Sequence, residues 1–161
     1  MSNLEIRVER PDHPGVAGLL SDLDAYLAGL YAPEDNHILD VQALRAPDVT
    51  LLAAWLDGEP VGCGAVRRMP AEAATDGAPY AEIKRMFVVP HARGRGLAGR
   101  VLGRLESIVA AEGFTRSLLE TGRDQSAALR VYERFGYMRR GPFGGYPDNG
   151  LSLFYEKRLA A

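Results

Sequence analysis

The sequence is poor in cysteine and lysine, and it has no long apolar run. Cys63 is the one cysteine among 161 residues, so neither an intrachain disulfide nor a cysteine-based zinc site is available. No apolar run approaches the ~18 residues that a membrane-spanning helix needs. The N-terminal residues lack the basic and apolar pattern of a signal peptide. We therefore expect a soluble cytoplasmic protein with no metal and no membrane partner.

Net charge is nearly absent as well. The formal net charge is −2, because 21 acidic residues face 19 basic ones, and Lys84 and Lys157 are the two lysines. Without a basic field there is no electrostatic footprint for DNA or RNA, so we expect no nucleic-acid partner. The hydrophobic fraction of 47% is that of an ordinary globular protein. The length suits one core, and we predict a single domain over residues 1–161.

Hydrophobic periodicity divides the chain into strands and helices. We expect strands at residues 4–8, 49–56, 61–66, 83–89 and 117–121, from Tyr137 on, and at residues 151–159. We expect helices at residues 14–30 and 38–44, from Leu97 to Gly113, and from an N-cap at Asp124 to Gly136. Asp57 and Gly58 have the composition of a hairpin turn. This order predicts an α/β fold, a mixed β-sheet flanked by helices on both faces.

Gly62 and Gly64 surround Cys63 within one of the predicted strands. Glycine weakens a strand, so a pair of glycines suggests that another segment packs closely there. Cys63 has no activating partner in the sequence around it. We expect a small buried core residue rather than a nucleophile.

The stretch of residues 82–99 organises the rest of the chain. An apolar strand ends at Pro90, and a glycine-rich turn at residues 93–96 leads into a helix with one apolar face. Such a turn leaves backbone N–H groups of the helix N-terminus unpaired, and the helix dipole adds a positive field. Arg93 and Arg95 strengthen the attraction for phosphate. We therefore expect a phosphate-bearing ligand at this turn.

One interpretation of the turn is a dinucleotide site. Gly94, Gly96 and Gly99 satisfy the G-x-G-x-x-G fingerprint, and Glu120 follows at about the distance of a ribose-binding acid. That pattern would suit an NAD(P)-dependent oxidoreductase. Against it, residues 90–93 separate the strand from the first glycine, and too little chain follows for several more βαβ crossovers.

A second interpretation accounts for more of the sequence. Residues 93–98 match Arg-x-x-Gly-x-Ala, and residues 82–90 form a strand that ends in valine and proline. Residues 125–137 are similar to Asn-x-x-Ala-x-x-Leu-Tyr-x-x-x-Gly-Phe, with Gln125, Val131 and Tyr137 in place of asparagine, leucine and phenylalanine. With these motifs in register, the chain resembles the GNAT family of acyl-CoA N-acyltransferases. The resemblance implies transfer of an acetyl group from acetyl-CoA to a primary amine in one ternary complex, with a non-catalytic CoA-binding module as the alternative.

The resemblance also implies where acetyl-CoA binds. The family's central strand offers backbone hydrogen bonds to pantetheine, and one N–H there can polarise the thioester carbonyl. The turn cradles the pyrophosphate, and the next helix adds further contacts. The residues at the matching positions are Phe87, Val88, Val89, Arg93, Gly94, Arg95, Gly96, Leu97, Ala98, Gln125 and Tyr132.

Three residues are candidates for proton transfer. Tyr132 matches the family's tyrosine, which implies a general acid for the leaving thiolate, although its spacing with Leu129 and Phe135 also fits an ordinary apolar helix face. Glu82 matches a strand glutamate that is a base in some members of the family, and Glu120 ends the adjacent predicted strand. Either carboxylate could act through a water or pair with an arginine instead, so the base stays open.

The acceptor is the least defined part of the site. Binding residues concentrate on loops, and residues 31–37 and 142–150 are polar or turn-rich segments. The candidates on them are Tyr31, Glu34, His37, Phe143 and Tyr146. Carboxylates suit a cationic amine and aromatic rings an apolar one, so we expect a small-molecule amine rather than a protein. Dimers are common in the family, and a homodimer is a further expectation.

Overall fold

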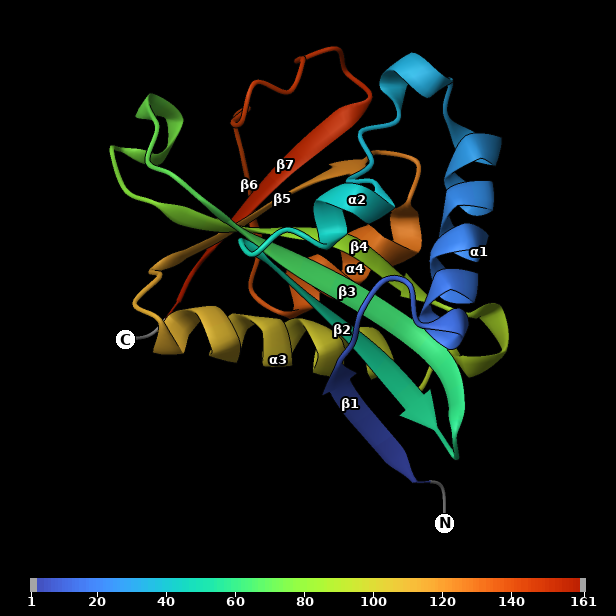
Figure 1. Ribbon diagram of the computed structural model, residues 1–161. Coiled ribbons are helices and arrows are strands. Elements are labelled where there is room, and N and C mark those ends of the chain that lie inside the picture. Colours follow the sequence, from blue (N-terminus) through green and yellow to red (C-terminus); the bar gives the residue numbers. More distant parts are fainter. Residues whose placement is uncertain (1–2, 160–161) are drawn as a thin grey trace. The chain divides into compact units, whose positions relative to one another are not determined.

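The elements follow one another in the order that the sequence predicts (Figure 1). The strands are β1 (Leu4–Val8), β2 (Val49–Leu56), β3 (Glu59–Met69), β4 (Tyr80–Val88), β5 (Arg116–Gly122), β6 (Met138–Arg140) and β7 (Ser152–Arg158). The α-helices are α1 (Pro14–Leu30), α2 (Val41–Leu44), α3 (Leu97–Ala111) and α4 (Ser126–Arg134). Single 3-10 turns form η1 (Pro33–Asp35), η2 (Ala73–Thr75) and η3 (Pro90–Ala92).

This computed structural model describes residues 3–159, which form two compact units. Unit 1 contains the described residues up to Val66 together with Lys84–Leu105. Unit 2 contains Arg67–Ile83 together with the described residues from Glu106 on. Strands β3 and β4 and helix α3 each contribute residues to both units, so no linker separates them. One domain over residues 1–161 stays a prediction, and residues 1–2 and 160–161 lie outside the described part.

The strands form the mixed sheet that the sequence predicts. They are hydrogen-bonded in the order β1-β2-β3-β4-β5-β7-β6. β4 and β5 run parallel, whereas β1 with β2, β5 with β7, and β6 with β7 run antiparallel. Parallel neighbours require a crossover connection, and α3 provides it between β4 and β5. The α/β fold class is therefore confirmed.

Close packing inside unit 1 depends on the two glycines of β3. A Cβ atom on Gly64 would lie 2.4 Å from the sulfur of Met86 and 2.9 Å from a methyl group of Val101. A Cβ atom on Gly62 would lie 3.1 Å from the carbonyl oxygen of Phe87. Glycine is therefore required where β4 and α3 approach β3. The prediction of close packing at this pair is confirmed.

Unit 2 has an aromatic core of its own. Tyr80, Leu118, Phe143 and Phe154 are each buried and pack together, and Tyr146 packs against them. The centre of the Phe143 ring lies 5.6 Å from that of Tyr80, 5.7 Å from Tyr146 and 5.8 Å from Phe154, each pair edge to face. This core fastens the turn-rich segment of residues 142–150.

The hairpin turn follows the prediction, whereas the second helix is shorter than predicted. Asp57 and Gly58 have φ angles of 51° and 83°, the left-handed pair that a two-residue type I′ turn needs. The helix predicted at residues 38–44 is reduced to α2. The Asp40 side chain accepts a hydrogen bond from the backbone N–H of Ala43 (2.8 Å), so it caps the helix at a later start.

Two further boundaries differ from the predictions. Asp124 as the N-cap of α4 is wrong, because Gln125 holds that position, without a capping hydrogen bond from its side chain. Phe135, predicted on the apolar face of this helix, is 38% exposed. β4 begins at Tyr80 rather than at residue 83, since buried residues extend the strand toward its N-terminal end.

The substitution Gly64→Ala should lower the free energy of unfolding by about 1–3 kcal/mol, because the added methyl group overpacks unit 1. The matched control is Gly103→Ala in α3, where a Cβ meets nothing within 4 Å. That change should instead stabilise by about 0.5–1 kcal/mol, because alanine favours the helix. Urea unfolding of both variants measures the difference, and equal stability would contradict the packing argument.

Candidate active site

Unit 1 carries the glycine-rich turn that follows β4. The chain leaves η3, passes through Gly94 and Gly96 with φ angles of 81° and 75°, and enters α3 at Leu97. These left-handed angles strain a residue that has a Cβ atom, whereas glycine adopts them freely. Residues 93–96 are exposed. The turn therefore presents the positive N-terminal end of a fifteen-residue helix to an anion from solvent.

Arg93 fixes this turn against the end of β4. Its Nε donates a hydrogen bond to the carbonyl oxygen of Val88 (2.9 Å). Its guanidinium carbon lies 5.9 Å from the centre of the Phe87 ring, within cation–π range. Arg95 is exposed in the same turn. The two exposed arginines thus differ, because Arg93 holds the turn through its hydrogen bond to Val88, whereas Arg95 extends into solvent from the turn.

A cavity of about 580 Å³ lies beside the turn within unit 1. Phe87, Val89 and Arg93, three of the predicted cofactor residues, line it. The lining also includes Gly15 and Gly18 of α1, and a Cβ atom on Gly18 would meet nothing within 4 Å. The volume falls within the range of about 300–1,000 Å³ that is usual for ligand pockets. Unit 1 therefore offers a ligand-sized space next to the glycine-rich turn.

The other predicted cofactor residues are placed as follows. Leu97 is buried, and Val88 and Ala98 are half-buried, so a ligand would meet mainly their backbone atoms. Gln125 belongs to unit 2, at the start of α4. Its side chain is not used to cap that helix.

Unit 2 brings both predicted bases to one face of the sheet. In the parallel pair of β4 and β5, Glu82 lies opposite Leu118. Glu120 follows Leu118 by two residues, so its side chain points to the same face. Glu82 is 2% exposed, whereas Glu120 is half-buried. The two carboxylates therefore share a face but differ in their access to water.

Tyr146 lies over Glu82. Its hydroxyl donates a short hydrogen bond to a carboxylate oxygen of Glu82. Burial, followed by the negative charges of Glu82 and Glu120, raises the pKa of this hydroxyl. A buried carboxylate requires such a donor. The structure thus joins a residue predicted to bind the acceptor with a residue predicted as the base.

Tyr132 is the buried residue of α4. The centre of its ring lies 6.0 Å from that of Tyr137 and 6.5 Å from that of Tyr155. Burial, and then the charge of Glu120, raise the pKa of its hydroxyl above the ordinary value of 10.0. The group is a protonated donor within electrostatic reach of Glu120.

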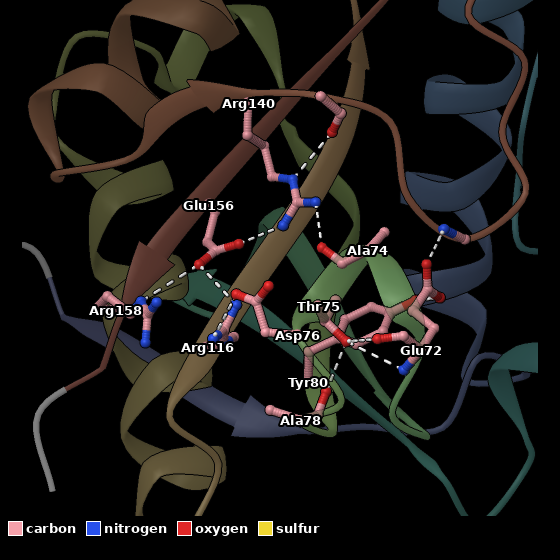
Figure 2. A network of polar contacts seen from close by, with 12 residues as sticks. Glu72, Ala74, Thr75, Asp76, Ala78, Tyr80, Arg116, Arg140, Glu156 and Arg158 are labelled. Atoms are coloured by element: carbon pink, nitrogen blue, oxygen red, sulfur yellow. Dashed lines mark hydrogen bonds and ion pairs between the residues drawn. The ribbon is translucent and has the colours of Figure 1, made fainter.

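Glu72, which sequence reasoning missed, holds the segment that carries Tyr146 (Figure 2). One of its carboxylate oxygens accepts a hydrogen bond from the backbone N–H of Gly144 (2.9 Å), and the other accepts one from the Tyr80 hydroxyl (2.9 Å). Glu72 also forms a capping box with Thr75 around η2. The pair reverses the usual order of a capping box, which has Ser or Thr first and Glu or Gln three residues later, so the sequence contained no recognisable signal.

Arg140 anchors η2 through a second set of contacts (Figure 2). Its Nη2 donates to the carbonyl oxygen of Ala74 (2.6 Å), and its Nη1 pairs with Glu156. Arg116 pairs with Asp76 at 3.2 Å and with Glu156 at 3.6 Å. The segment before β4 is therefore tied to β5, β6 and β7. These contacts hold the backbone that carries Glu72 in place.

The remaining acceptor candidates are not alike. Tyr31 and His37 are half-buried in unit 1, and the His37 carbonyl oxygen accepts a hydrogen bond from Lys84 Nζ (3.1 Å). Glu34 is exposed in η1. Phe143 is 2% exposed in the aromatic core of unit 2, so it supports the segment beside Tyr146.

Cys63 is a core residue, as predicted. It is 1% exposed, and its S–H donates to the carbonyl oxygen of Arg85 (3.3 Å). Burial raises the pKa of the thiol to about 12. A buried thiol that keeps its proton is a poor nucleophile.

Residues 3–159 show neither a metal-binding group nor a membrane-spanning helix. That part of the chain contains no group of three or more His, Cys, Asp or Glu residues suited to hold a metal ion. Its helices are too short or too polar to span a membrane.

Comparison with known proteins points to one family. The sequence model described as the Acetyltransferase (GNAT) family matches residues 17–137. The chain is 44% identical to the IAA acetyltransferase of Azospirillum brasilense, over 99% of this chain and 100% of that protein. It is 33% identical to the uncharacterized N-acetyltransferase YsnE of Bacillus subtilis (strain 168), over 79% and 81%. A solved structure from Klebsiella pneumoniae, provisionally assigned as an acyl-CoA N-acyltransferase, matches with a TM-score of 0.79 at 31% identity and covers 98% of both chains.

Removing the Glu72 carboxylate should loosen the segment that carries Tyr146. We expect Glu72→Ala to lower the free energy of unfolding by about 1–3 kcal/mol, because Gly144 and Tyr80 lose their acceptor. Amide hydrogen exchange at residues 144–146 should accelerate. The control is Glu34→Ala at an exposed site, with an effect within about 0.5 kcal/mol. Unchanged exchange at residues 144–146 would contradict the role of Glu72.

Proposed function

The chain belongs to the GNAT acetyltransferase family, and from this premise we propose that it transfers an acetyl group directly to the primary amine of a small molecule. The observation that carries the proposal is the grouping of Glu82, Glu120, Tyr132 and Tyr146 within unit 2, where acid and base candidates influence one another. When bound, acetyl-CoA supplies the acetyl group, whose carbonyl carbon bonds to the acceptor nitrogen as its bond to sulfur breaks.

We assign the holding of acetyl-CoA to the turn and the strand that leads to it. The left-handed Gly94 and Gly96 and the exposed Arg95 fit a pyrophosphate group, since they combine helix N–H groups with a guanidinium. Backbone groups of Phe87, Val88 and Val89 fit the amides of pantetheine, as the family resemblance implies. An N–H group among these three residues is the candidate to polarise the thioester carbonyl.

Tyr132 is proposed to donate its hydroxyl proton to the leaving thiolate. The role requires a protonated hydroxyl, and burial keeps this one protonated at neutral pH. The rings of Tyr137 and Tyr155 hold the Tyr132 ring, which orients the donor. The buried and protonated Cys63 supports direct transfer, since a route through an acetylated cysteine requires a thiolate.

Glu120 is proposed to take the proton of the acceptor amine through a water. Its half-buried position supports this role, because the proton must then pass on to solvent. Glu82 is 2% exposed and already accepts the hydrogen bond from Tyr146. We assign to this pair the placement of the acceptor rather than the removal of its proton.

The acceptor is proposed to be a small molecule rather than a protein. The name of the Azospirillum relative, IAA acetyltransferase, supports this choice and makes IAA one compound to test. We also propose a cytoplasmic location and a homodimer, the arrangement common in the family. Size-exclusion chromatography with light scattering measures the assembly directly.

The substitution Tyr132→Phe should lower kcat by roughly 10²–10⁴-fold, because the thiolate then leaves without a positioned proton donor. Affinity for CoA should change little, since the ring and its packing remain. Thiol release measures turnover, and calorimetry with CoA measures binding. Tyr155→Phe is the matched control, because it also removes a tyrosine hydroxyl from a neighbouring ring. The Tyr155 hydroxyl donates its hydrogen bond to Glu133 and has no proposed part in proton transfer. Equal turnover of the two variants would remove Tyr132 from its role.

Comparing Glu120→Gln with Glu82→Gln separates the two carboxylates. We expect Glu120→Gln to lower kcat/KM by roughly 10²–10⁴-fold and to abolish its decline at acidic pH, as for loss of a general base. Glu82→Gln should chiefly raise KM, because Tyr146 loses a charged acceptor. The reverse order of effects would identify Glu82 as the base.

A further inference from the structure

Strand β4 contains a residue with a left-handed backbone, Arg85, whose φ is 59°. Residues with a Cβ atom rarely adopt this region, and such strain is found chiefly at functional sites. Neighbouring strand residues normally point to opposite faces. Here Lys84 Nζ reaches the His37 carbonyl oxygen (3.1 Å), while Arg85 Nη1 reaches Asp24 in α1. Both buried cations of unit 1 therefore point toward α1 and the connection that follows it.

The guanidinium of Arg85 has one edge that the protein does not use. Its side chain is 2% exposed, and Nη1 is engaged by Asp24. Nε and Nη2 are closed to solvent, and neither has a hydrogen-bond partner in the described part of the chain. These two nitrogens form one edge of the planar group, with parallel N–H bonds. That edge matches the two oxygens of a carboxylate.

We propose that this edge of Arg85 binds a carboxylate of the acceptor, so that the substrates are amines that also carry a carboxylate. This inference rests on the proposed function, because it concerns the acceptor of acetyl transfer. A carboxylate would satisfy both buried donors at once, whereas a neutral amide offers a single acceptor oxygen. Asp24 engages Nη1 and keeps the edge in place.

Entry of the carboxylate requires the cover of this edge to open. The connection of residues 31–40 contains three predicted acceptor residues, Tyr31, Glu34 and His37. The hydrogen bond from Lys84 ties it to β4 one residue away from Arg85. The proposal requires local opening around this edge, since Nε and Nη2 are closed to solvent.

The direct test is NMR of the whole protein, following the Nε–H of Arg85, assigned by its loss in Arg85→Lys. Butyrate and phenylacetate are titrated against butyramide and phenylacetamide, with inorganic phosphate as a separate arm. We expect saturable shifts with the carboxylates and binding of the amides weaker by about tenfold or more. A response to phosphate alone, or no response to either carboxylate, would overturn the inference.

Three variants separate ligand binding from a purely structural clip between α1 and β4. Arg85→Gln removes the edge and the contact with Asp24, whereas Asp24→Asn weakens the contact alone. If the edge binds the acceptor, Arg85→Gln loses carboxylate binding and Asp24→Asn retains it. Equal losses would show that the pair only fastens the helix. Arg10→Gln breaks an exposed arginine–aspartate pair with Asp12 and is the matched control.

Turnover distinguishes this inference from the proposed function. Phenylalanine is compared with phenylethylamine, and γ-aminobutyrate with propylamine, because the members of each pair differ by a carboxylate. We expect kcat/KM to favour the carboxylate-bearing member by about tenfold or more, and Arg85→Gln to abolish that preference. Acetyl transfer that ignores the carboxylate would overturn this inference alone. Carboxylate binding at Arg85 without thiol release for any amine would contradict the proposed function and leave the binding site intact.

Discussion

A carboxylate buried in a central strand determines how unit 2 is built. Glu82 is 2% exposed, and a charged group in that position requires a hydrogen-bond donor. Tyr146 supplies it, which obliges the segment of residues 142–150 to fold back over the sheet. Phe143 anchors that segment in the aromatic core, and Glu72 holds it through Gly144. The segment is therefore held at three points, and one of them is the hydrogen bond between Tyr146 and Glu82.

The two units handle charge in opposite ways. Unit 1 offers positive groups, the N-terminal end of α3 with its glycine turn and the buried Lys84 and Arg85. Unit 2 gathers carboxylates and keeps nearby tyrosine hydroxyls protonated. Binding of anionic groups suits the first environment, and movement of protons suits the second.

Features set by local chain chemistry could be predicted from the sequence. The order of elements, the Asp57–Gly58 hairpin and the glycine turn follow from periodicity and from the freedom of glycine. Contacts across long sequence distances could not be predicted, because Tyr146 and Glu82 are 64 residues apart. Arginine has no preference for a left-handed backbone, so the positive φ angle of Arg85 could not be predicted from the sequence. The prediction of Asp124 as the N-cap was wrong. A residue with a good capping side chain caps a helix only if the backbone places it at the N-cap position, and Gln125 holds that position.

Gly94 and Gly96 show what kind of constraint keeps a glycine in place. A Cβ atom built on either would meet nothing within 4 Å. A side chain is therefore not excluded by lack of space. It is excluded because an L-amino acid with a Cβ atom is strained at these φ angles. A D-alanine would accept φ angles of 81° and 75° without strain and would have room for its methyl group. The glycine-rich turn thus selects by mirror symmetry, and glycine is the one genetically encoded residue that is its own mirror image.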